Sequence, residues 1–67
     1  MEFTKTHREF ILKQLNEANS EMETKFKSKK HFEDKQQEEI AELCEIDIFL
    51  LEHKIELLNR MLIDNNL

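Results

Sequence analysis

The chain has 67 residues, a formal net charge of −5, a single cysteine, and neither glycine nor proline. This length leaves room for one domain, and one cysteine excludes a disulfide within the chain. Without glycine and proline, strands joined by tight turns are disfavoured, whereas the many Lys, Glu, Gln, Leu and Ile residues favour helices. The sequence therefore predicts an all-α protein, folded as a single helical hairpin over residues 1–67.

A capping pattern marks the start of the predicted first helix, which covers about residues 4–27. Thr6 is followed three residues later by Glu9, the spacing of a capping box, and Thr4 is the alternative cap. Apolar residues then recur at the spacing of one helical face. They are Ile11, Leu15, Ala18, Met22 and Phe26. This stripe gives the first helix one face that requires burial.

A basic turn is expected after this stripe, over about residues 28–33. Phe32 falls about 240° round the helix from Phe26, so the apolar face loses its phase there. A break near Asn19 is the alternative. The second helix is then predicted over about residues 33–64, which makes it longer than the first by roughly two turns.

Six apolar residues of the predicted second helix recur at alternating gaps of four and three, the spacing of a coiled-coil seam. They are Cys44, Ile48, Leu51, Ile55, Leu58 and Leu62. A second apolar row lies beside them and comprises Ile40, Leu43, Leu50, Leu57 and Met61. We expect the seam to meet a second copy and the second row to meet the first helices. The predicted fold is thus a two-helix antiparallel hairpin that dimerises into a four-helix bundle or a coiled-coil-like assembly.

Asp47 and Lys54 interrupt the second row, where a charge is costly unless it is paired. They lie about 10.5 Å apart along one helix, too far for a direct ion pair. An antiparallel dimer places Asp47 opposite Lys54 of the other copy, whereas a parallel dimer places it opposite Glu52. We therefore predict a register pair and favour the antiparallel orientation, with the parallel one left open. The alternatives are that both residues sit at the rim of the apolar face, or that they bond to charged residues of the first helix, namely Arg8 or Lys13 for Asp47 and Glu17 or Glu21 for Lys54.

Ile46 and Phe49 project toward the acidic side of the same helix. The glutamates on this side are Glu42, Glu45, Glu52 and Glu56. If they are exposed, Ile46 and Phe49 form a hydrophobic patch with an acidic rim, which fits a basic and partly apolar site on a partner protein. The alternative is that a neighbouring copy covers them.

The motifs of several other functions are missing from the sequence. The histidines match neither the HExxH nor the Glu-x-x-His spacing, and no Ser/His/Asp arrangement or glycine-rich phosphate loop occurs. We therefore expect no enzyme activity, cofactor or metal. Because there is no broad basic face, membrane-length apolar run or signal segment, we expect no nucleic-acid binding and no membrane association, and a cytoplasmic location.

These features predict a small non-enzymatic protein–protein interaction module. It would act as a homodimeric regulator, such as an inhibitor, an antirepressor or an adaptor, that binds a partner protein. One alternative is a structural assembly protein whose role is oligomerisation. Another is an acidic mimic of DNA that blocks a DNA-binding protein. A third is binding of an anionic lipid or nucleic acid through the lysines around the turn, Lys25, Lys27, Lys29, Lys30 and Lys35.

Overall fold

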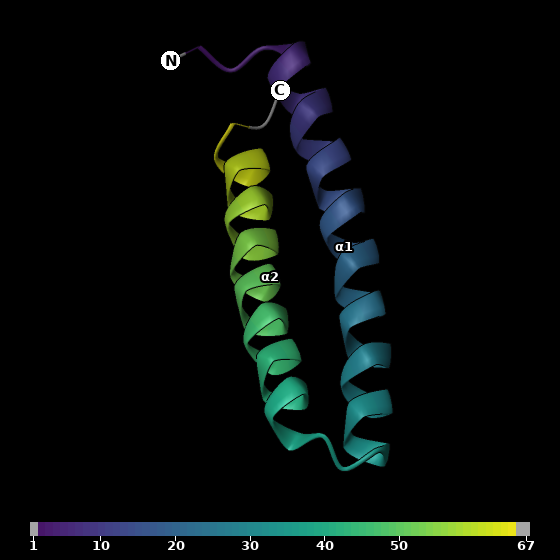
Figure 1. The fold of residues 1–67 in the computed structure, drawn as a ribbon. Coiled ribbons are helices and arrows are strands. Elements are labelled where there is room, and N and C mark those ends of the chain that lie inside the picture. Colours follow the sequence, from purple (N-terminus) through teal and green to yellow (C-terminus); the bar gives the residue numbers. More distant parts are fainter. Residues whose placement is uncertain (1, 66–67) are drawn as a thin grey trace.

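The computed structural model describes residues 2–65 and shows two long antiparallel helices (Figure 1). Helix α1 spans Lys5–Asp34 and helix α2 spans Glu38–Asp64. The helices lie side by side and are joined by a short turn, so the start of α1 and the end of α2 share one end of the molecule (Figure 1). The resulting rod measures 48 × 14 × 14 Å. The predicted all-α antiparallel hairpin is confirmed.

Thr4 caps the N-terminus of α1 in partnership with His7. The backbone N–H of His7 donates to Oγ1 of Thr4 at 3.3 Å, and the backbone N–H of Thr4 donates to Nδ1 of His7 at 3.0 Å. These two bonds form a reciprocal capping box in which an imidazole takes the place of the usual carboxylate. The alternative cap at Thr4 is therefore the one used, and the box predicted at Thr6 and Glu9 is wrong.

Helix α1 has no break at either position that the sequence indicated. It runs through Asn19 and through the predicted basic turn at residues 28–33, and it ends at Asp34. Helix α2 begins at Glu38 instead of near residue 33. The helices contain 30 and 27 residues, so α2 does not outrun α1. The predicted position of the turn is wrong.

The apolar face of α1 continues through the predicted turn because the residues that face α2 recur every seven positions. Phe26, by contrast, follows Ala18 after eight positions. Ala18 is buried, and Lys25 and Phe32, at successive seven-residue steps from it, are both half-buried. Phe26 is 49% exposed and lies at the edge of the face. A phase measured from Phe26 therefore misplaced Phe32, which lies on the side that faces α2.

A Schellman motif ends α1 without a glycine. Gln36 adopts the left-handed conformation with φ 60°, and its N–H donates to the carbonyl of Glu33 at 3.0 Å. The N–H of Gln37 donates to the carbonyl of Phe32 at 2.8 Å. These are the two bonds that define the motif, whose left-handed position is usually occupied by glycine. The sequence therefore carried no glycine marker at the true turn.

The buried core lies between the two helices and is thin. Its members are Ile11 and Ala18 from α1, and Ala41, Cys44, Ile48 and Leu51 from α2. In the part of α2 that the structure describes, no side chain after Leu51 is fully buried. A hairpin with so small a core has little apolar burial to offset the entropy of ordering its chain, so a further interaction is expected to contribute to its stability.

Candidate protein-interaction surface

The predicted self-association seam lies largely inside the hairpin. Cys44, Ile48 and Leu51 are buried in the single chain, and the remaining members, Ile55, Leu58 and Leu62, are half-buried. Helix α1 therefore covers the face that we expected to meet a second copy. A short turn tethers α1 to α2, so α1 has a high effective concentration beside α2. It therefore competes more strongly than a second molecule for the seam of α2.

Three members of the second row, Leu43, Leu50 and Leu57, lie on the side of α2 that faces away from α1, whereas Ile40 is 40% exposed and Met61 is half-buried. Leu43, Ile46, Leu50 and Leu57, here named the outer apolar row, are 61%, 55%, 59% and 61% exposed. At about 100° per residue, these four positions fall within about 60° of one another, and their centre lies about 130° round the helix from the centre of the seam. Helix α2 is thus apolar over two neighbouring faces, and α1 covers only one of them. The expectation that the first helix packs on the second row is corrected.

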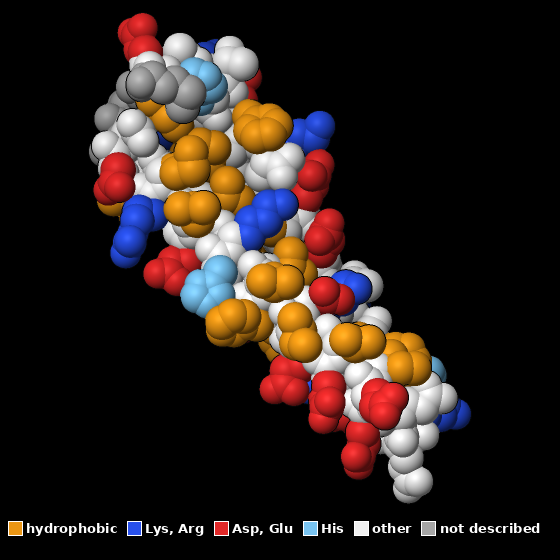
Figure 2. Space-filling view, turned by 60° about the vertical axis from the view of Figure 1, so that its left-hand side comes forward, with side chains coloured by type: hydrophobic (Ala, Val, Ile, Leu, Met, Phe, Trp, Pro, Cys, Tyr) orange, Lys and Arg blue, Asp and Glu red, His pale blue; other side chains and the backbone are white. Residues whose placement is uncertain are grey.

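A space-filling view makes the uncovered apolar surface visible. Figure 2 brings the α2 side of the hairpin forward and shows apolar side chains along the long axis, interrupted near the middle by a basic side chain, with carboxylates at the margins. An exposed apolar surface of this kind is uncommon on monomeric proteins and marks interaction sites.

Ile46 and Phe49 are both exposed in the single chain, at 55% and 58%. Ile46 is a member of the outer apolar row, and Phe49 lies beside it. The Phe49 ring meets the His53 imidazole edge-on, with ring centroids 4.4 Å apart. The glutamates predicted to rim this patch, Glu42, Glu45, Glu52 and Glu56, are also exposed. The apolar and acidic components of the predicted patch therefore both face solvent.

Asp47 forms an ion pair with α1 within the hairpin. Its Oδ2 atom lies 3.1 Å from Nζ of Lys25 on α1, and both side chains are partly exposed. The hydrogen bond to Asp47 and the charge of its carboxylate raise the pKa of Lys25 above its ordinary value, against a small opposing effect of desolvation. The predicted alternative of pairing with α1 holds for Asp47, but through Lys25 and not through Arg8 or Lys13.

The position of the turn explains this choice of partner. Lys25 and Asp47 are each eleven positions from Gln36, so they lie at the same level of the hairpin. A turn centred near residue 30 would have placed Asp47 level with Lys13. Lys54, the other member of the predicted register pair, is exposed and has no ion-pair partner among residues 2–65.

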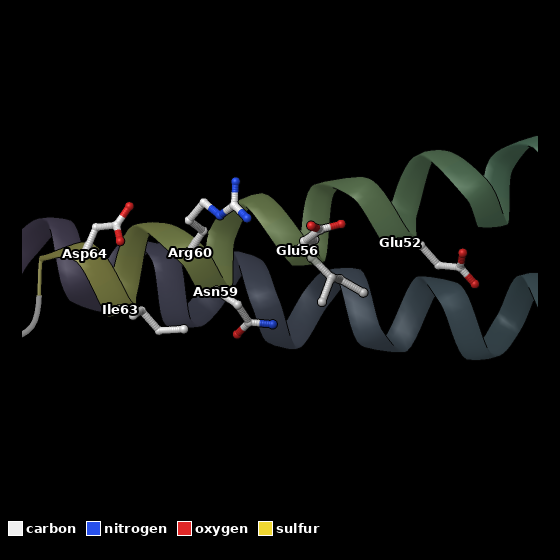
Figure 3. Close-up of a pocket in the computed structure, with 7 residues that line it drawn as sticks. Glu52, Glu56, Asn59, Arg60, Ile63 and Asp64 are labelled. Carbon is white, nitrogen blue, oxygen red and sulfur yellow. The ribbon is translucent and has the colours of Figure 1, made fainter.

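An open groove runs along the C-terminal half of α2 (Figure 3). It is lined by Glu52, Ile55, Glu56, Asn59, Arg60, Ile63 and Asp64. In Figure 3, Arg60 and Asp64 point away from the side on which Asn59 and Ile63 lie. The polar groups therefore do not converge on one point, as they would in a small-molecule site. Within residues 2–65, no group of three or more His, Cys, Asp or Glu side chains is placed to hold a metal ion.

Neither helix, over the part of the chain that the structure describes, contains a stretch long and apolar enough to span a bilayer. No protein family, curated protein or solved structure matches this chain. The outer apolar row of α2 with its acidic margin is therefore the candidate functional surface, on the basis of its geometry and chemistry alone.

Proposed function

We propose that this protein is a small non-enzymatic interaction module that regulates a process by docking the outer apolar row of α2 onto a protein partner. The observation that carries the proposal is the exposure of Leu43, Ile46, Leu50 and Leu57, each by more than half, on the face that α1 leaves uncovered. Three of these residues have the i, i+3, i+7 spacing by which a helix anchors itself in an apolar groove.

The charged margin of the row supports a protein partner over a nucleic acid. Glutamates are exposed on one side of α2, and the chain as a whole carries a net charge of −5. An acidic surface repels a phosphate backbone and favours a partner whose apolar site has basic residues at its edge. The regulator would act by occlusion, because a helix that fills such a site excludes other ligands from it.

Photo-crosslinking tests this proposal directly. A photoreactive benzoylphenylalanine replaces Leu50 in the outer apolar row or, as a matched control, the exposed Asn16 on α1. In the cells that make the protein, we expect adducts from position 50 only, and we expect Leu57→Glu in the same chain to abolish them. Adducts with another protein support the regulator, whereas adducts with a second copy alone favour the assembly role described next. Equal adducts at both positions, or none at position 50, would contradict it.

A structural assembly role is the second candidate, because α2 has a second apolar row that α1 leaves exposed. In that case the outer apolar row has no foreign partner and serves only to hold copies together. Masses well above that of a dimer, which grow with concentration, would favour this role over the regulator.

A further inference from the structure

The outer apolar row has the repeat of a second coiled-coil seam. Leu43, Leu50 and Leu57 are spaced by seven residues, and Ile46 and His53 follow the first two at a distance of three. This is the a and d pattern of a heptad, with four apolar positions and one histidine. The members with large apolar side chains are exposed in the single chain. The face is therefore suited to pairing with another helix over residues 43–57, about two heptads.

The charges beside this seam indicate which helix. Asp47 and Lys54 occupy the same flanking position in successive heptads, on the margin nearer α1. When two identical helices pair antiparallel, this flank meets its own copy. Asp47 then lies opposite Lys54 of the second copy, and the two-fold axis repeats the contact. In a parallel pair the opposite flanks meet, and Glu42 lies against Asp47 of the second copy, which is a contact between like charges.

The existing ion pair of Asp47 leaves room for this contact. Lys25 contacts Oδ2 of the carboxylate, and Asp47 remains 47% exposed. A carboxylate has acceptor sites on both oxygens, so Oδ1 is free to accept from a lysine of a second molecule. Lys54, which has no ion-pair partner among residues 2–65, supplies the complementary charge.

We infer that two copies of this chain pair antiparallel through the outer apolar row of α2, with two Asp47–Lys54 contacts between the copies. The inference rests on the part of the proposed function that makes the outer apolar row a protein-docking surface, and it takes a second copy of this chain as the protein that docks there. In this register Ile46 packs against Leu57 of the second copy, and Leu50 packs against His53. Pairing buries the exposed row of both copies and supplies apolar burial that the thin core of one hairpin lacks.

Light scattering on charge variants tests the pairing. We expect the wild type to have twice the mass of one chain, which is 8.2 kDa. Lys54→Glu leaves the Lys25–Asp47 pair intact but opposes two acids in each contact, so it should give the mass of a single chain. The triple variant Lys25→Glu/Asp47→Lys/Lys54→Glu reverses every charge and should restore the dimer. Lys13→Glu, on α1, is the matched control and should remain dimeric.

Disulfide trapping tests the register independently. In a Cys44→Ala background, oxidation of a mixture of Ile46→Cys and Leu57→Cys chains should give crosslinked dimers, whereas neither chain alone should. Crosslinking of Ile46→Cys chains with one another would overturn the antiparallel register. A wild type that keeps the mass of a single chain at high micromolar concentration would overturn the inference. The proposed function would survive if position 50 still crosslinked to a different protein, and both would fail if it did not.

Discussion

Lys25 of α1 and Asp47 of α2 lie level with each other across the hairpin, with Nζ and Oδ2 3.1 Å apart. This pair lies at the margin of the interface between the two helices. On one side of Asp47 the Cys44–Ile48–Leu51 face is turned inward, and on the other side the outer apolar row is turned away from α1. One ion pair thus marks the boundary between the hairpin's own interface and the surface left for a partner.

The Lys25–Asp47 pair should contribute to stability in a pH-dependent way. The folded-state pKa of Lys25 is raised above the ordinary value of about 10.4 that we assign to the unfolded chain. The contribution is therefore complete below about pH 10.4 and is lost as the pH rises through the raised folded-state value. We expect wild type and Lys25→Met to differ in free energy of unfolding at pH 8 and to converge at strongly alkaline pH. A difference that stays constant over that range would contradict this assignment.

Replacing Thr4, the N-cap of α1, should destabilise the protein more than replacing Thr6. Thr4→Ala removes the side-chain acceptor for the His7 N–H and should lower the free energy of unfolding by about 1 kcal/mol. Thr6→Ala is the control, since Thr6 lies within α1 and is exposed, and its effect should stay within about 0.5 kcal/mol. Urea unfolding followed by circular dichroism measures both. Equal losses would show that the capping box does not act as described.

Gln36 should be a position where glycine stabilises the protein. A non-glycine residue in the left-handed conformation, such as Gln36, costs about 1–2 kcal/mol of stability. Glycine avoids this cost, but its greater conformational entropy in the unfolded chain offsets about 0.5–1 kcal/mol of that gain. We therefore expect Gln36→Gly to raise the free energy of unfolding by up to about 1 kcal/mol. Gln36→Val should lower it, because a β-branched residue fits this conformation poorly. Loss of stability in the glycine variant would contradict the turn geometry.

Substitution of Ile48 should mainly weaken folding of the single chain, whereas substitution of Leu50 should mainly weaken its association. Ile48 is 6% exposed and Leu50 is 59% exposed, although both belong to apolar rows of the same helix. At concentrations low enough to keep the chain monomeric, Ile48→Ala should lower the free energy of unfolding by about 2–4 kcal/mol and Leu50→Ala by less than about 0.5 kcal/mol. At high concentration only the wild type and not Leu50→Ala should gain stability with concentration. The reverse order of effects would restore the original assignment of the two rows.

The helices and the hairpin were predictable because their apolar residues are periodic over many turns. The position of the turn was not predictable, because the left-handed residue that ends a helix is usually a glycine and here it is Gln36. The lysines within residues 28–33, which suggested a turn there, remain helical. The misplaced turn then shifted the expected partner of Asp47 from Lys25 to residues nearer the N-terminus. A register error at one turn thus changed the interpretation of a charge eleven residues away.

The two apolar rows of α2 were also visible in the sequence, but not which of them α1 covers. Periodicity gives the angle between Ile48 and Leu50 on one helix and says nothing of where a second helix packs. The exposure of Ile46 and Phe49 was likewise open, because a neighbouring copy or the first helix could have covered them. The packing of α1 decides which row it covers and leaves Ile46 and Phe49 exposed in the single chain, and this packing depends on the length and geometry of the turn.

The most direct test of the central claim is the mass in solution of the wild type and of Leu50→Glu, with Leu12→Glu on α1 as the exposed-leucine control. The pairing of α2 helices predicts the mass of a dimer for the wild type and for Leu12→Glu. For Leu50→Glu it predicts the 8.2 kDa of a single chain, with unchanged helicity. A wild type that has the mass of a single chain at every concentration, or a Leu50→Glu chain that remains dimeric, would contradict it.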